Sequence, residues 1–168
     1  MNYGEQRGVV EQKDAILDEE VRGQGVFVSQ FKHGLDSKRR LTIPSQWRAQ
    51  VGSPKSLYVL PDIQHKCLCV FPSSEITHRL GRIRQYPIGD TKAREFARVL
   101  AAQSDLISWD SQGRIRIKDE LLAFAQIEDE VVLVGAFDRF ELWNPEQLKK
   151  AGGLDQSKLA DAAKYVGF

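Results

Sequence analysis

Short alternating strands dominate the pattern of hydrophobic and polar positions, and one such pattern occurs twice. An apolar-polar-apolar segment at 41–43 follows a polar turn that starts at Asp36, and a similar segment at 115–117 follows a turn that starts at Asp110. The two turns are 74 positions apart. Repetition at a fixed offset indicates an architecture in which one structural unit is used twice.

In each unit a helical pattern follows the alternating segment, and two further strands come next. The helical pattern places apolar residues four positions apart, at Trp47 and Val51 in the first unit and at Leu121 and Ala125 in the second. Such a spacing puts each pair on one helix face. Strands are expected over 26–31, 41–43, 56–60, 67–71, 105–109, 115–117, 130–134 and 139–143.

These elements divide the chain into five segments. They are an N-terminal extension over 1–24, a first half-unit over 25–87, a linker helix within 88–104, a second half-unit over 105–150 and a tail over 151–168. Four or five short strands bury little apolar surface alone, so the halves are expected to share one core as a pseudo-two-fold pair. The predicted class is α+β, rich in β-structure, with short peripheral helices.

Composition and charge narrow the class of protein. Of the 168 residues, 42% are hydrophobic and 28% are charged, which is typical of a soluble globular chain. No apolar run approaches the roughly 20 residues that a membrane span needs. The net charge of +1 argues against a uniformly basic nucleic-acid-coating protein but allows a local basic patch. Two cysteines do not make a disulfide framework, so a reducing cytoplasm is expected.

The first turn is the most basic point of the sequence. Lys38, Arg39 and Arg40 are consecutive, and three adjacent cations repel one another without helping the fold. They suit a polyanion, because Lys and Arg bind phosphates and Arg also reads guanine. The alternative is an ordinary solvated surface, in which an ion pair between the first and fifth residues simply locks each turn.

The fourth position of the turns differs between the two copies. Gly113 holds it in the second turn and Arg39 in the first. Glycine adopts a positive φ without strain. Arg39 therefore either adopts a costlier conformation or changes the shape of the first turn.

Four common enzyme motifs would indicate catalysis. The sequence contains no phosphate-binding glycine loop, dinucleotide-binding motif, zinc-protease motif or nucleophile elbow. The histidines at 33, 65 and 78 are scattered, with no evident carboxylate partner. We expect neither an enzyme nor a cofactor or small-molecule substrate.

One metal-like pattern is present, His65-Lys66-Cys67-Leu68-Cys69. Strand alternation would direct the three ligand-type side chains to one face, but zinc takes four ligands and usually two to four residues between cysteines. An offset of 73, read from the prolines that follow the last strand of each unit, puts Cys67 and Cys69 in the core-like places of Phe140 and Leu142. We interpret both cysteines as small buried hydrophobes and predict no metal site.

The aromatic residues allow two interpretations. They could form a base-stacking platform, but their positions follow the periodicity of a core, which is the interpretation favoured here. The residues concerned are Trp47, Phe71, Trp109, Phe137, Phe140 and Trp143.

The paired turns, together with Asp129–Gly135 and Arg139–Trp143, resemble the MraZ family of bacterial transcriptional regulators. The resemblance covers about 27–149. It implies two tandem SpoVT-AbrB-like half-units in one pseudosymmetric AbrB-type β-barrel of the double-ψ or swapped-hairpin kind. It also implies a ring-shaped homo-oligomer, favouring eight subunits. Such a ring binds double-stranded DNA at short direct repeats in its own promoter region and regulates, usually represses, the division and cell wall gene cluster.

The resemblance also implies a set of DNA-binding residues. The family's basic turn matches Lys38 and Arg40, to which we add the adjacent Arg39, and the second turn matches Arg114, with Arg116 beside it. Arg40 is the candidate for base reading, and Lys38 and Arg39 for phosphate contacts. The expected location is cytoplasmic and nucleoid-associated. The alternative function is an AbrB-like protein-interaction or antitoxin-type module that binds an acidic protein partner.

Overall fold

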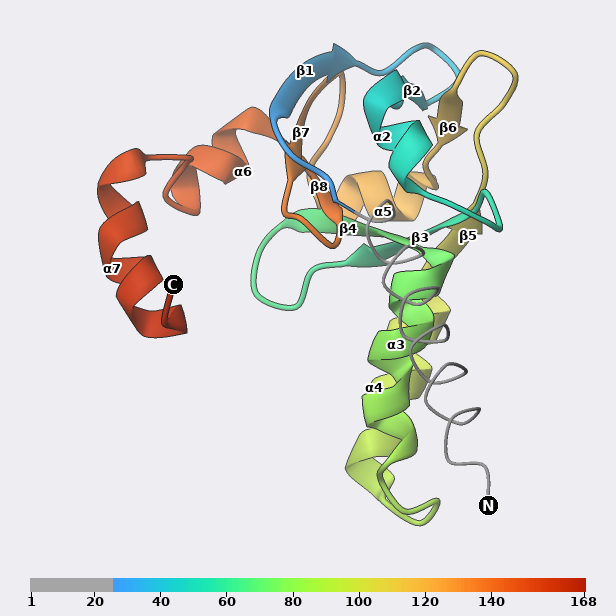
Figure 1. Cartoon of the computed structure of the whole chain (residues 1–168). Helices are drawn as coiled ribbons and strands as arrows, with labels where there is room; N and C mark the ends of the chain where they lie inside the picture. Colours follow the sequence, from blue (N-terminus) through green and yellow to red (C-terminus); the bar gives the residue numbers. More distant parts are fainter. Residues whose placement is uncertain (1–25) are drawn as a thin grey trace, which may run out of the picture.

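The computed structural model of the chain describes residues 26–168, so the predicted extension over 1–24 lies outside the described residues. A β-rich body carries a projecting pair of helices and a helical C-terminal segment (Figure 1). The strands are β1 (Gln30–Gly34), β2 (Arg40–Thr42), β3 (Leu57–Pro61), β4 (Cys67–Pro72), β5 (Asp105–Ile107), β6 (Arg114–Arg116), β7 (Glu130–Gly135) and β8 (Phe140–Trp143). The helices are α2 (Ser45–Gln50), α3 (Ser73–Arg84), α4 (Thr91–Gln103), α5 (Asp119–Phe124), α6 (Pro145–Lys150), η1 (Gln156–Lys158) and α7 (Leu159–Val166).

The strands form one six-stranded antiparallel sheet and a separate two-stranded ribbon. The sheet order is β1-β7-β8-β4-β3-β5, and the ribbon pairs β2 with β6. Among the strands of residues 26–168, only the hairpins β3–β4 and β7–β8 stay within one half. The pairs β1–β7, β4–β8, β3–β5 and β2–β6 all join the two halves. The α+β class is therefore confirmed. Hydrogen bonds among the described strands leave β1 and β5 as open edges, so a closed AbrB-type barrel stays a prediction.

A single main core contains apolar side chains of both halves. At its centre the Trp47 ring of α2 lies 4.9 Å from the Phe140 ring of β8 and 5.9 Å from that of Phe27, centroid to centroid. Leu41 of β2 and Ile115 of β6 face each other and are fully buried, which fixes the ribbon to the body. The core interpretation of the aromatics is wrong for Phe137, whose side chain is 70% exposed.

The first predicted strand, 26–31, is displaced in the structure. Ser29 has a positive φ of 76°, which breaks the extended backbone, and β1 begins only at Gln30. Upstream of Ser29, Phe27 forms an isolated bridge with Phe137.

The last strand pair aligns between the halves at a different offset from the predicted 73. Helix α3 begins at Ser73 and α6 at Pro145, which are 72 positions apart. In the core, Leu68 and Val70 face Leu142 and Phe140 across β4 and β8. The predicted equivalence of the cysteines with Phe140 and Leu142 is therefore wrong. Six residues separate the last pair of the first hairpin, Pro61 and Leu68, but only four separate Gly135 and Phe140 in the second, so β8 is shifted by one residue from the predicted alignment.

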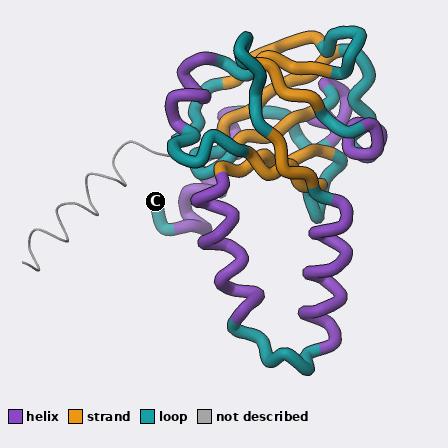
Figure 2. The backbone as a smooth tube through the Cα atoms, turned by 90° about the vertical axis from the view of Figure 1, so that its right-hand side faces the viewer, coloured by secondary structure: helices purple, strands orange, loops and turns teal. Residues whose placement is uncertain are grey.

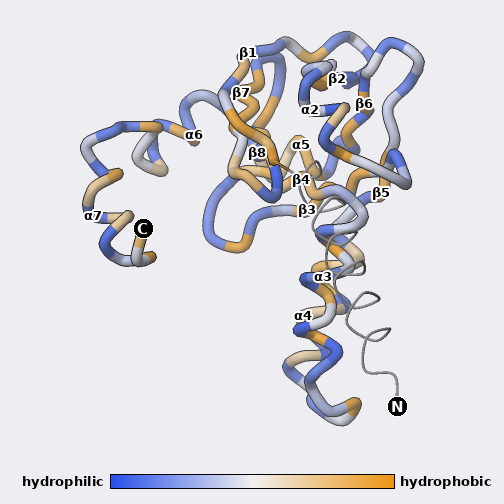
Figure 3. Tube along the Cα trace, in the orientation of Figure 1, coloured by the Kyte–Doolittle hydropathy of each residue, from blue (hydrophilic) through white to orange (hydrophobic). Residues whose placement is uncertain are grey.

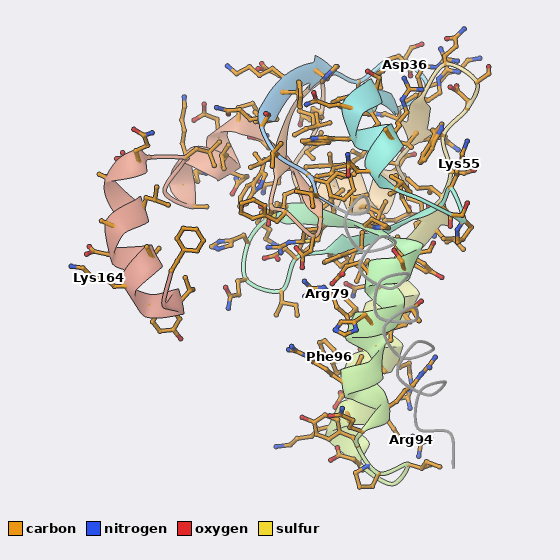
Figure 4. The ribbon with its side chains drawn as sticks, viewed as in Figure 1. Asp36, Lys55, Arg79, Arg94, Phe96 and Lys164 are labelled. Carbon is orange, nitrogen blue, oxygen red and sulfur yellow. The ribbon has the colours of Figure 1, made fainter. Side chains whose placement is uncertain are left out.

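The helices α3 and α4 form a hairpin that projects from the body (Figure 2). Asp90 caps α4 by accepting a hydrogen bond from the N–H of Ala93 at 2.9 Å. Arg79 of α3 pairs with Glu75 and with Asp138 in the β7–β8 turn, and so ties the base of the hairpin to the body (Figure 4). No helix in the described range 26–168 is long and apolar enough to cross a membrane.

Candidate nucleic-acid interface

The first basic turn is held by the carboxylate that begins it. Asp36 Oδ1 accepts hydrogen bonds from the backbone N–H groups of Lys38 and Arg40, both at 2.9 Å. Asp36 Oδ2 accepts from Arg40 Nε at 2.7 Å. One aspartate therefore fixes both the backbone of the turn and the root of the Arg40 guanidinium.

The second turn repeats this geometry almost atom for atom. Asp110 Oδ1 accepts from the backbone N–H groups of Gln112 at 2.9 Å and Arg114 at 3.0 Å, and Oδ2 accepts from Arg114 Nε at 2.8 Å. The Arg114 guanidinium, helped by the backbone N–H of Arg114, lowers the pKa of Asp110 to about 2. The backbone N–H of Arg40 is the largest cause of the lowered pKa of Asp36. Both carboxylates are thus ionised at neutral pH, and the predicted locking pairs are present.

The fourth residue of each turn has a left-handed backbone conformation. The φ of Arg39 is 59°, and that of Gly113 is 78°. Arg39 therefore adopts the costlier conformation, and the turn is not reshaped. Each of these residues also ties its turn to the opposite half. The Arg39 carbonyl accepts from the N–H of Ile117 at 3.3 Å, and the Gly113 carbonyl accepts from the N–H of Ile43 at 2.9 Å. The first turn keeps its shape and carries the strain of a non-glycine residue.

Substituting the two left-handed positions is expected to have unequal effects. A Cβ on Gly113 would lie 2.5 Å from the guanidinium of Arg48, so Gly113→Ala is expected to lower the free energy of unfolding by about 1–3 kcal/mol. Arg39→Gly relieves strain but adds freedom to the unfolded chain, so its effect is expected to stay within about 1 kcal/mol. Denaturant unfolding followed by circular dichroism measures both. Equal stability of Gly113→Ala and the parent chain would contradict the assignment.

The ribbon β2–β6 presents a cationic outer face. Strand alternation directs Leu41 and Ile115 inward and leaves Arg40 opposite Arg116 on the outer side. Like charges directly opposite one another on paired strands are destabilising. The remaining outer pair is Thr42 and Arg114. Arg40 is ion-paired with Asp36, whereas Arg116 opposite it pairs with no described residue. This additional exposed cation favours a role in binding an anion.

All five predicted DNA-contacting residues lie on this ribbon and its two turns, at the end of the body near Asp36 (Figure 4). They differ in how far the fold already uses them. Arg39 Nη1 donates to the carbonyl of Glu128 at 2.9 Å, while Arg40 and Arg114 are ion-paired. The exposed side chains of Lys38 and Arg116 make no hydrogen bond or ion pair to another described residue. The loops around the ribbon are largely hydrophilic (Figure 3).

Arg48 is a cation at this site that sequence reasoning missed. It lies on α2, and its guanidinium packs against the backbone of Gly113 in the second turn. Its Nε is buried and has no hydrogen-bond partner among the described residues. Gly113 was interpreted from the sequence only as a residue that tolerates a positive φ, which gave no indication of Arg48.

Comparisons with known proteins bear on the family of the chain. The family model described as "MraZ protein, putative antitoxin-like" matches residues 100–158. "Transcriptional regulator MraZ" of Pediococcus pentosaceus is 38% identical over 141 residues, covering 84% of this chain and 96% of that protein. The protein of the same name from Halothermothrix orenii is 33% identical over 134 residues, covering 79% and 90%.

A third protein of that name extends the match over a whole relative. In Clostridium tetani it is 28% identical over 145 residues, covering 85% of this chain and 100% of that protein. These relatives are named as regulators and not as enzymes, which agrees with the expectation from the missing catalytic motifs. At these identities and coverages, the chain belongs to the MraZ family.

Proposed function

We propose that the chain is a DNA-binding transcriptional regulator whose β2–β6 ribbon and its two turns contact double-stranded DNA. The observation that carries the proposal is the pairing of Arg40 with Arg116 on an exposed ribbon. This pairing works against stability and concentrates positive charge in a chain whose net charge is only +1. The names of the relatives as transcriptional regulators support the same reading.

The residues of the site take different roles in this proposal. A two-stranded β-ribbon fits the major groove of B-DNA, and an arginine there contacts guanine with two donors. Arg40 is our candidate for that contact. Asp36 holds its Nε, so the terminal amino groups would contact the base. Lys38 contacts phosphate, as do the nitrogens of Arg39 that do not donate to Glu128. Arg114 and Arg116 extend the contact along the second strand of the ribbon.

The proposed function also requires that several subunits assemble. Several copies of one weak site, placed on successive direct repeats, bind together far more tightly than one copy does. A ring of subunits, with eight favoured, suits such an operator. Its target is the promoter region of the division and cell wall gene cluster, including its own gene, where it acts as a repressor in the cytoplasm on the nucleoid. The barrel closure that the family resemblance implies belongs to the same proposal.

A second candidate is a module that binds an acidic protein, as the antitoxin-like description of the matching family model suggests. A gel-shift experiment separates the two candidates. It uses DNA from upstream of the chain's own gene cluster, with a shuffled sequence of equal length as the control. A shift that prefers the natural sequence supports the regulator, and absence of any preference favours the protein partner.

Arg40→Ala tests the central residue of the site. We expect DNA affinity to fall by about tenfold or more, as for loss of a specific arginine–base contact, while the size of the assembly by light scattering stays unchanged. Asp36→Asn is the matched control, because it frees the guanidinium without removing the cation. Equal loss in both variants would assign Arg40 to positioning the turn. Unchanged affinity in Arg40→Ala, or loss of the assembly, would contradict its role as a DNA contact.

A further inference from the structure

A cluster of metal-ligand side chains lies on the β3–β4 hairpin, away from the ribbon. The carboxylate of Asp62 and the thiols of Cys67 and Cys69 lie within 4.8 Å of one another. The Cys69 thiol donates to Asp62 Oδ1 at 3.4 Å. Both cysteines are almost fully buried, with exposed fractions of 1% and 6%.

The local fold explains why these groups meet. Asp62 follows the last residue of β3, and its N–H donates to the carbonyl of Cys67 at 3.0 Å, which closes the hairpin. Asp62 Oδ2 accepts from the backbone N–H groups of Gln64 at 2.9 Å and His65 at 2.8 Å. The same carboxylate therefore shapes the turn with one oxygen and faces a thiol with the other. Alternation along β4 puts both thiols on this side.

A polar cavity lies beside the cluster. It has a volume of about 330 Å³ and is lined by Asp62, His65 and Cys67, together with residues of β8 and α6. The His65 ring is 5.8 Å from the Trp143 ring, measured between centroids. A fourth ligand-type side chain therefore borders the same space as the carboxylate and the first thiol.

Both thiols lie outside the main core, in two smaller apolar clusters that also border polar groups. Across the sheet, Cys67 is paired with Trp143 and Cys69 with Glu141. Arg139 lines the same cavity, and its guanidinium pairs with Asp138 and Glu141, both at 3.0 Å. Its positive charge is thus compensated and does not by itself exclude a cation from the site.

We propose that this hairpin binds one zinc-type divalent cation through Asp62, His65, Cys67 and Cys69. Nitrogen, sulfur and carboxylate oxygen are the ligands that zinc takes, four at a time and tetrahedrally. The two cysteines bind as thiolates, so two protons leave when the metal enters. Because all four ligands come from eight consecutive positions, the ion fixes the loop that joins β3 to β4.

Cobalt(II) is the probe that tests the proposal, because tetrahedral thiolate coordination gives it strong visible and near-ultraviolet absorption. The full chain, reduced and freed of metal, is titrated with Co(II). We expect absorption that saturates at one Co(II) per chain and disappears when Zn(II) is added. Absence of a saturable signal would overturn the proposal.

Variants identify the ligands. The double variant Cys67→Ser, Cys69→Ser is expected to lose the absorption, and His65→Ala to weaken binding by about tenfold or more, the loss typical of disturbing a metal site. His33→Ala and His78→Ala are matched controls with no expected change. Since buried serines could unfold the hairpin, protection of the wild-type thiols from alkylation by Zn(II) is measured as well. Wild-type affinity in His65→Ala, or thiols alkylated equally fast with and without Zn(II), would overturn the four-ligand site.

Discussion

Arg116→Thr is expected to weaken DNA binding by about tenfold for each subunit in contact with DNA, without lowering the stability of the fold. The substitution makes the second copy of the repeat identical to the first at this position, where Thr42 stands. It removes an exposed guanidinium that makes no hydrogen bond or ion pair within the described residues. It also removes the like charge that faces Arg40 across the ribbon.

The expected stability change follows from that pairing. Like charges directly opposite on paired strands cost roughly 0.2–1 kcal/mol, so the free energy of unfolding of Arg116→Thr should stay the same or rise slightly. Weaker DNA binding together with an unchanged or higher free energy of unfolding would show that Arg116 serves DNA binding and not the stability of the fold. Denaturant unfolding and DNA titration are performed on the same preparation.

The salt dependence of binding gives an independent measurement. Each phosphate contact contributes about 0.9 to the slope of log affinity against log salt concentration, so this slope should become shallower in Arg116→Thr. Lys164→Ala, on the C-terminal helix far from the ribbon (Figure 4), is the matched loss of one cation and should change neither affinity nor slope. An equal loss of affinity in both variants would mean that DNA binding depends on the net charge of the chain and not on the position of the cation on the ribbon.

Much of the ribbon was predictable because it depends on short-range chemistry. An aspartate that caps a turn and pairs with an arginine four positions later is a local device, and it occurs in both copies. Alternation then decides which strand residues are buried, as Leu41 and Ile115 are. The repeat also predicted correctly that both halves contribute to one core.

Other features depend on contacts between distant residues and were not predictable. The Arg39 side chain was expected to be available for phosphate, yet one of its nitrogens donates to a carbonyl 89 positions away. The packing of Arg48 against Gly113 likewise joins the two halves. Residue propensity and hydrophobic periodicity depend on neighbouring positions in the sequence. They therefore predict the role of such a side chain from its residue type and not from its distant contacts.

The misplaced cysteines show how sensitive a strand is to register. A shift of one residue moves every side chain to the other face of a strand. The repeat alignment had the offset wrong by one position, so it matched Cys67 and Cys69 to Phe140 and Leu142. Both cysteines are buried, as predicted, but they lie on the opposite side of the sheet from those two residues. Only the strand pairing with β8 gives the correct side.

Trp47→Ala is expected to have the largest effect on stability. Three aromatic rings surround this side chain, those of Phe27, Phe31 and Phe140, at centroid distances of 5.9, 5.2 and 4.9 Å. Its Nε1 also donates to the carbonyl of Val28 at 2.9 Å. Removing a large aromatic from a filled core costs about 3–5 kcal/mol, a large part of the stability of an ordinary domain.

The loss of stability in Trp47→Ala also tests whether the two halves share one core. The ring belongs to the first half but packs on Phe140 of the second, so both halves are expected to lose stability together in one transition. Leu121 is the equivalent residue of the second half, and Trp47→Leu keeps part of the apolar volume that Trp47→Ala removes, so it should cost clearly less. Thermal unfolding followed by circular dichroism and by fluorescence of the remaining tryptophans measures this. Two separate transitions in Trp47→Ala would show that the halves fold independently, against the shared core.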